Sequence, residues 1–240
     1  MIEYNSKTSF ASSASRTATF DSALRDYMVK VYQHMSVALA ISGLIAFMVS
    51  SSPQLMQAIF GTPLAYLVMF APLVFVIVFG FKINSLSAEK AKNYLYFYSA
   101  LMGLSMATIF VVYTATSITR VFLITASTFG AMSLYGYSTK KDLTSFGSFL
   151  IMGLIGIMIA SLVNIFLKSS GLDFAISIIG VFVFIGLTAY DTQRIKQTYY
   201  HFAGNDEMVN KMAVLGALNL YMDFINLFIM LLRFFGERKN

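Results

Sequence analysis

Long apolar stretches separated by short polar connections dominate the chain after about residue 30. A bilayer core of ~30 Å is crossed by ~20 apolar helical residues. Stretches of about that length predict seven transmembrane helices, at residues 31–50, 62–81, 93–115, 121–136, 145–167, 172–190 and 212–235. The connections are too short to hold a soluble domain. We therefore predict an all-α polytopic membrane protein with a single seven-helix domain over residues 29–240.

Residues 1–28 have a different composition, rich in Ser and Thr and without an apolar run. A secretory signal needs a continuous hydrophobic stretch, so this segment is not predicted to be one. We expect a disordered cytosolic N-terminal tail over residues 1–28.

The overall composition supports a membrane protein and excludes several kinds of site. The chain is 58% hydrophobic and only 12% charged, whereas soluble domains carry about 25% charged residues. There is no cysteine and there are only two histidines, which excludes disulfides, thiolate metal sites and a histidine-rich zinc site. The net charge of +6 indicates cytoplasmic loops and no nucleic-acid partner, because basic residues of membrane proteins stay on the cytoplasmic side.

The distribution of Lys and Arg predicts the orientation in the membrane. With the N-terminus in the cytoplasm, twelve basic residues fall in the N-terminal tail and the cytoplasmic loops, and two fall in the opposite loops. The positive-inside rule therefore favours a cytoplasmic N-terminus. Three more basic residues follow or end the last helix, and seven complete spans would place them outside. The sequence leaves the side of the C-terminus open.

Asp223 lies near the middle of the apolar stretch LNLYMDFINLFIMLLRFFG (218–236). An ionised Asp at mid-bilayer costs about 2.5–3.5 kcal/mol on insertion scales. Asn219 and Asn226 lie four residues before and three residues after it, which places all three on one helical face. This narrow polar stripe is expected to face protein or water, since lipid cannot solvate it.

A second carboxylate, Asp191, lies near the predicted cytosolic end of the sixth helix, about 6 Å inside it. Helix seven begins on the same side, so Asp191 and Asp223 are expected to meet at similar depth. Two carboxylates in one low-dielectric site share a proton, which gives a pair whose charge changes near neutral pH. The alternative is a satisfied polar contact that only holds two helices together.

Three segments, AYDTQRIK (189–196), KKDLTSFGSFL (140–150) and ALNLYMDFINLFIMLLRFFG (217–236), resemble the Bax inhibitor-1 (transmembrane Bax inhibitor motif) family. The resemblance covers about residue 25 to the C-terminus, and the absence of eukaryotic sorting features favours a bacterial member. It implies seven helices with the C-terminal helix central and wrapped by the other six. It also implies a pH-sensitive calcium leak, and the paired aspartates of the family match Asp191 and Asp223.

The family pattern further implies a basic latch at the cytosolic end of helix two, bonded to the aspartate pair in the closed state. FGFK places Lys82 at that position, where an arginine is usual, and lysine cannot form the bidentate contact of a guanidinium. Lys82 is thus a candidate latch of a weaker kind.

The resulting hypothesis is a pH-sensitive calcium leak channel of the bacterial inner membrane, and not an enzyme. Asp191 and Asp223 would form the ion pathway, the pH sensor and a weak, transient calcium site, with Asn219 and Asn226 as candidate polar lining. Calcium prefers six to eight oxygen ligands, so few protein oxygens give the weak binding that permeation needs. No cofactor is expected; the expected partners are lipid, calcium ions and protons, and the expected state is a monomer.

Other functions fit some of the same features. A proton-coupled transporter also uses membrane carboxylates, and a non-conducting factor could act through a membrane protease or regulatory partner. An intramembrane aspartyl protease matches Tyr190–Asp191, but Asp223 lacks a Gly-x-Gly-Asp context and no Pro follows Pro72. A retinal protein is excluded because the seventh span has no lysine for a Schiff base.

Overall fold

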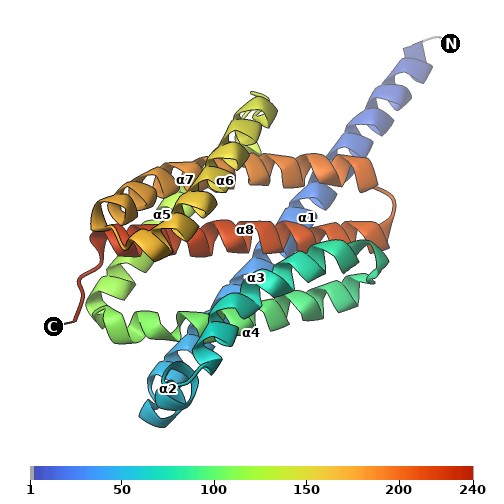
Figure 1. Ribbon diagram of the computed structural model, residues 1–240. Helices are drawn as coiled ribbons and strands as arrows, with labels where there is room; N and C mark the ends of the chain where they lie inside the picture. The colour runs from blue at the N-terminus through green and yellow to red at the C-terminus, as the bar shows by residue number, and fades with distance from the viewer. Residues whose placement is uncertain (1–2, 240) are drawn as a thin grey trace.

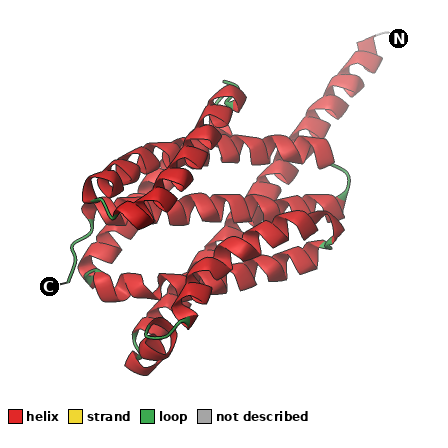
Figure 2. Ribbon diagram, in the orientation of Figure 1, coloured by secondary structure: helices red, strands yellow, loops and turns green. Residues whose placement is uncertain are grey.

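The computed structural model describes the backbone of residues 3–239 and the side chains of residues 21–83 and 85–239. Over these residues the chain is helical, apart from short connections and one isolated bridge between Tyr113 and Arg238 (Figure 2). The elements are α1 (Glu3–Ser50), α2 (Pro53–Phe60), α3 (Leu64–Lys82), a short 3-10 helix η1 (Ile83–Ser85), α4 (Ala88–Val112), α5 (Ala115–Ser138), α6 (Thr144–Leu167), α7 (Ser170–Phe202) and α8 (Asp206–Phe235).

Seven of the described helices are long and apolar enough to cross a membrane, which confirms the predicted all-α fold with seven spans. The exceptions are η1 and α2, and α2 is a short helix that the sequence analysis did not predict. Its start is explained by local chemistry: the Ser52 hydroxyl accepts a bond from the Leu55 N–H, and Pro53 occupies the first turn.

Several helices extend beyond the predicted apolar stretches. α1 begins well before residue 31, and Leu24, Tyr27 and Met28 are buried in the hydrophobic core. The helical domain therefore includes residues that we assigned to the tail; the side chains of residues 1–20 lie outside those described. α7 likewise continues to Phe202 as an amphipathic extension. Hydropathy marks only the lipid-embedded part of a helix, so it misses polar turns that continue it.

The C-terminal helix α8 lies in the middle of the bundle, with α7 along one side and α4 along the other (Figure 1). In its most apolar segment 72% of the residues are buried, against 11% for α6. Direct packing on α8 comes from α1, α4, α5 and α7, whereas α3 packs mainly on α4 and α6 mainly on α7. The wrapping is therefore two-layered, and four of the six surrounding helices form the inner layer.

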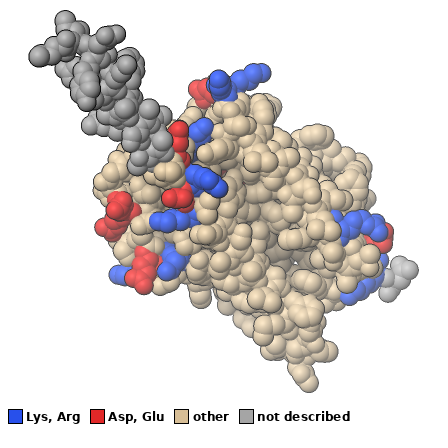
Figure 3. Space-filling model, turned by 180° about the vertical axis from the view of Figure 1, so that it is seen from behind, with Lys and Arg blue, Asp and Glu red and all other residues tan. Residues whose placement is uncertain are grey.

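Charged side chains gather at two ends of the molecule and leave an uncharged belt between them (Figure 3). The C-terminal segment lies at the end of the bundle where the α4–α5 turn is found. There the Thr114 N–H donates to the Glu237 carbonyl, and the Lys239 N–H donates to the Val112 carbonyl. Seven complete passes thus place the C-terminal segment at the opposite end of the bundle from the α5–α6 connection.

Candidate functional site: a carboxyl pair between α7 and α8

Asp191 on α7 and Asp223 on α8 are brought together, as the sequence predicts. Their carboxyl groups lie within hydrogen-bonding reach of each other. Asp223 is only 5% exposed, whereas Asp191 is half-buried. The pair therefore has one member in the dry interior of the bundle and one member nearer its surface.

The contact depends on the register of α7 against α8. Close approaches on both sides of the pair fix this register, since Gly216 packs on Ile195 and Gly180 packs on Met230. Asp191 lies roughly 16 Å before the end of α7 at Phe202, so the predicted position about 6 Å inside the helix end was wrong. The pair still forms, because α7 and α8 are both extended beyond the apolar stretch at the connection that joins them.

One buried oxygen of the pair has no conventional donor. Among the described residues, no N–H or O–H group donates to the buried Asp223 Oδ2, and the neighbouring polar group is the Asp191 carboxyl. Two ionised carboxylates repel each other and neither donates a hydrogen bond, so their contact is stable only when a proton lies between them or a cation joins them. The arrangement can therefore hold a proton and exchange it for a cation.

Arg194 lies one turn along α7 from Asp191 and attracts the Asp191 carboxylate electrostatically. Sequence analysis counted Arg194 only as a basic loop residue, although its i, i+3 spacing from Asp191 indicates the pairing. Lys82 is exposed at the end of α3, and no hydrogen bond or ion pair among the described side chains joins it to either aspartate. The structure thus does not place the candidate latch at the pair, because α3 packs mainly on α4 and not on α7 or α8.

Asn219 and Asn226 lie one turn on either side of Asp223 and are half-buried. They belong to a partly exposed stripe of α8, which also includes Met212, Leu215, Met222 and Ile229. Neither amide is hydrogen-bonded to the aspartates among the described contacts. The stripe leaves the pair beside polar groups that a hydrated ion could contact.

The three segments that carry the family resemblance meet around this pair. Gln193 accepts a bond from the Leu143 N–H at 2.8 Å and donates to the Lys141 carbonyl at 2.7 Å, which holds the α5–α6 connection against α7. Gly147 packs directly on the ring of Tyr190. The loop motif and the α7 motif therefore form one unit around Asp191.

A second polar contact ties α8 to the helices on its other side. The Ser42 and Tyr221 hydroxyls lie 2.6 Å apart, and Ser42 Oγ lies 2.7 Å from the Ser99 carbonyl oxygen. Gly103 makes this possible, because a side chain there would collide with the Ser42 backbone. Sequence analysis did not single out these residues, since lone Ser and Tyr residues in apolar helices give no periodic signal.

Two cavities lie on the side of the bundle formed by α1 and α5, and neither is lined by Asp191 or Asp223. The described residues also contain no cluster of three or more His, Asp or Glu side chains that could hold a metal ion. Within the described part of the chain, Asp191 and Asp223 would therefore offer a cation two carboxyl groups, fewer oxygens than the six to eight that calcium prefers.

Comparison with known proteins agrees with the resemblance seen in the motifs. A family profile described as Inhibitor of apoptosis-promoting Bax1 matches residues 24–240. The chain is 48% identical over 240 residues to the uncharacterized protein RP147 of Rickettsia prowazekii, with all of both chains covered. It is 48% identical over 219 residues to the inner membrane protein YbhL of Escherichia coli, with 90% of this chain and 93% of YbhL covered. With seven membrane-crossing helices and a match over nearly its whole length, the chain belongs to the Bax inhibitor-1 family.

Proposed function

We propose that the protein is a pH-sensitive calcium leak channel of the bacterial inner membrane, in which the Asp191–Asp223 pair controls conduction. The observation that carries the proposal is the buried Asp223 carboxyl, which has one oxygen (Oδ2) without a donor among the described residues and lies within hydrogen-bonding reach of a second carboxyl. The inner-membrane relative YbhL supports the location, and the choice of calcium rests on what the family resemblance implies.

The proposed closed state has one proton shared by the two carboxyls. Loss of that proton leaves two negative charges in a low-dielectric site, and a divalent cation relieves their repulsion. Because the site has few protein ligands, calcium binds weakly and leaves again, as conduction requires. Lower pH restores the proton and displaces the ion.

Opening is proposed to involve the outer layer of the bundle. α3 packs mainly on α4, and its C-terminal residue Lys82 is exposed. Displacement of α3 therefore breaks its contacts with α4 but leaves the packing of α7 on α8 intact. A contact between Lys82 and the pair would then belong to another conformation than the one described here.

Calcium entry into liposomes tests the proposal. The full-length protein is reconstituted with a calcium dye inside the vesicles, and entry is followed from about pH 5 to pH 8. We expect entry above that of protein-free vesicles, with a single pH midpoint. Entry no faster than in protein-free vesicles at every pH contradicts a channel. Entry that requires an opposing proton gradient points to a proton-coupled transporter instead.

A further inference from the structure

A groove runs between α1 and α5 on the side of the bundle away from the carboxyl pair. Its larger part has a volume of about 660 Å³, within the range of roughly 300–1,000 Å³ typical of ligand pockets. The floor is α8, through Phe224, whose ring packs edge-on against Phe122 and Phe129 of α5. The groove is therefore open along the lipid-facing side and closed by aromatic rings underneath.

The two ends of this groove differ in polarity. Arg25 and Tyr137 line one end, where α1 enters the bundle and α5 leaves it, and Leu39 and Phe122 line the other. Arg25 and Leu39 are separated by about 21 Å along α1, which is the ~15 Å of one leaflet of the bilayer core with about 6 Å left for a head group. The dimensions and the gradient of polarity match one lipid molecule lying along α1.

Two observations at the polar end indicate what it binds. Ser133 is only 5% exposed, lines the groove, and its hydroxyl has no hydrogen-bond partner among the described residues. Arg25 is exposed and makes no ion pair with a described side chain, although Asp21 and Asp26 are close in sequence. A buried hydroxyl without a partner and an unpaired guanidinium both lack an acceptor, which a phosphodiester with ester-linked chains supplies.

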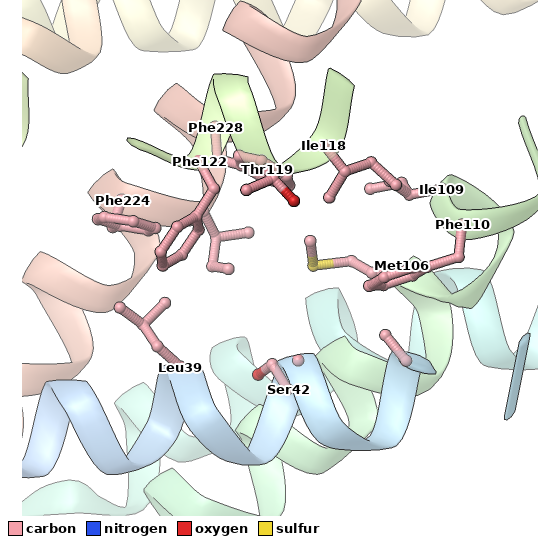
Figure 4. Close-up of a pocket in the computed structure, with 13 residues that line it drawn as sticks. Leu39, Ser42, Met106, Ile109, Phe110, Ile118, Thr119, Phe122, Phe224 and Phe228 are labelled. Carbon is pink, nitrogen blue, oxygen red and sulfur yellow. The ribbon is translucent and has the colours of Figure 1, made fainter. Parts of the chain in front are cut away.

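A second cation adds to the positive charge at this end. Lys196 Nζ donates to the Tyr137 carbonyl at 2.9 Å and lies 5.0 Å from the centroid of the Tyr137 ring. The apolar end continues into a smaller cavity of about 200 Å³. In Figure 4 its lining comes from α1 with Leu39 and Ser42, from α5 with Phe122, and from α4 with Met106, whose sulfur points into the space.

We propose that this groove is a binding site for an anionic phospholipid of the leaflet in which α1 begins. The phosphate lies at Arg25 with Lys196 nearby, the glycerol esters accept from Ser133, and one acyl chain lies over Phe224 toward Leu39. Neither Asp191 nor Asp223 lines this groove.

Native mass spectrometry of the delipidated full-length protein tests the site. The probes are phosphatidylglycerol and phosphatidylcholine with identical acyl chains. Wild type is expected to retain phosphatidylglycerol more strongly. Arg25→Gln is expected to weaken that retention about fivefold, which corresponds to one basic residue at an anionic lipid surface. Lys90→Gln, an exposed basic position on α4 outside the groove, is the matched control and is expected to behave as wild type.

A separate variant tests the part of the groove that is proposed to hold the acyl chain. A Cβ atom at Gly130, which lines the groove, meets no atom within 4 Å. Gly130→Leu therefore fills the groove and is expected to weaken the retention of both lipids. Arg25→Gln is expected to weaken the retention of phosphatidylglycerol only. Equal retention of the two lipids by wild type overturns the proposal, as does equal loss in Arg25→Gln and Lys90→Gln. If the protein is a dimer that retains neither lipid, the groove is occupied by a second copy of the chain, and the lipid proposal is also overturned.

Discussion

Gly136 of α5 packs directly against the main chain of Ala189 of α7, two residues before Asp191. A Cβ at residue 136 would collide with the Ala189 carbonyl, and a helix backbone cannot rotate away as a side chain can. The position of Asp191 therefore depends on a glycine in a neighbouring helix. Such close helix contacts through small residues are typical of packing in membranes.

Gly136→Ala is accordingly expected to force α5 and α7 apart. Overpacking at such a contact costs about 1–3 kcal/mol, which lowers the melting temperature of the purified protein in detergent. Gly130→Ala, on the same helix, is the matched control, because its new methyl group meets no atom within 4 Å. Equal melting temperatures for the two variants would show that α5 and α7 are not in the described contact.

The Ser42–Tyr221 hydrogen bond predicts an order of stabilities for two variants. Ser42→Ala leaves the fully buried Tyr221 hydroxyl without a partner and is expected to cost about 1–3 kcal/mol. Tyr221→Phe leaves Ser42 with the Ser99 carbonyl as acceptor, so its hydrogen-bond loss is expected to cost about 1 kcal/mol. Thermal melting of each variant against Ser127→Ala, an exposed site, checks the order, and the reverse order would contradict it.

Orientation in the membrane can be read by single-cysteine labelling, because the chain has no cysteine of its own. Lys239→Cys lies at the end of the bundle near the α4–α5 turn and Lys140→Cys at the opposite end. With the N-terminus in the cytoplasm, a membrane-impermeant maleimide added to spheroplasts is expected to label only Lys239→Cys. Labelling of only Lys140→Cys would reverse the orientation, and labelling of both in intact spheroplasts would contradict seven complete spans.

Substitutions of Arg194 and of Lys82 are expected to have different effects on the pH response of calcium flux. Arg194 attracts the ionised Asp191 carboxylate, so its removal favours the protonated pair. Arg194→Gln is expected to move the pH midpoint of flux upward. Lys82→Gln is expected to leave the midpoint unchanged, because Lys82 is exposed and apart from the pair in this conformation. A shift with Lys82→Gln alone would assign the cationic role to the latch of the family pattern.

The sequence was sufficient for the spans and for the meeting of Asp191 with Asp223. Both follow from one-dimensional signals: apolar length, and two acids on consecutive helices that meet at the same side of the membrane. Arg194, Gln193 and Ser133 were missed for different reasons. Gln193 and Ser133 act through contacts with other helices, which no local pattern encodes. Arg194 follows a helical spacing that is visible only if α7 is known to continue past its apolar part.

The position of Lys82 depends on the packing of whole helices. The family pattern assigns it to the pair, but the contact requires α3 to lie beside α7 and α8, and here α3 lies in the outer layer on α4. A motif can specify which residues are present, whereas the conformation decides which of them touch.

The central claim is that one proton shared by two acids controls the passage of calcium. Reconstituted Asp191→Asn and Asp223→Asn proteins test it most directly, with calcium entry measured across pH and with Asp173→Asn as the control. Asp173 is an acid of α7 at the far end from the pair, where it forms a half-exposed ion pair with Arg233. We predict that each pair variant loses the pH dependence of entry while Asp173→Asn keeps it. Wild-type flux and an unaltered pH midpoint in both pair variants would contradict the account.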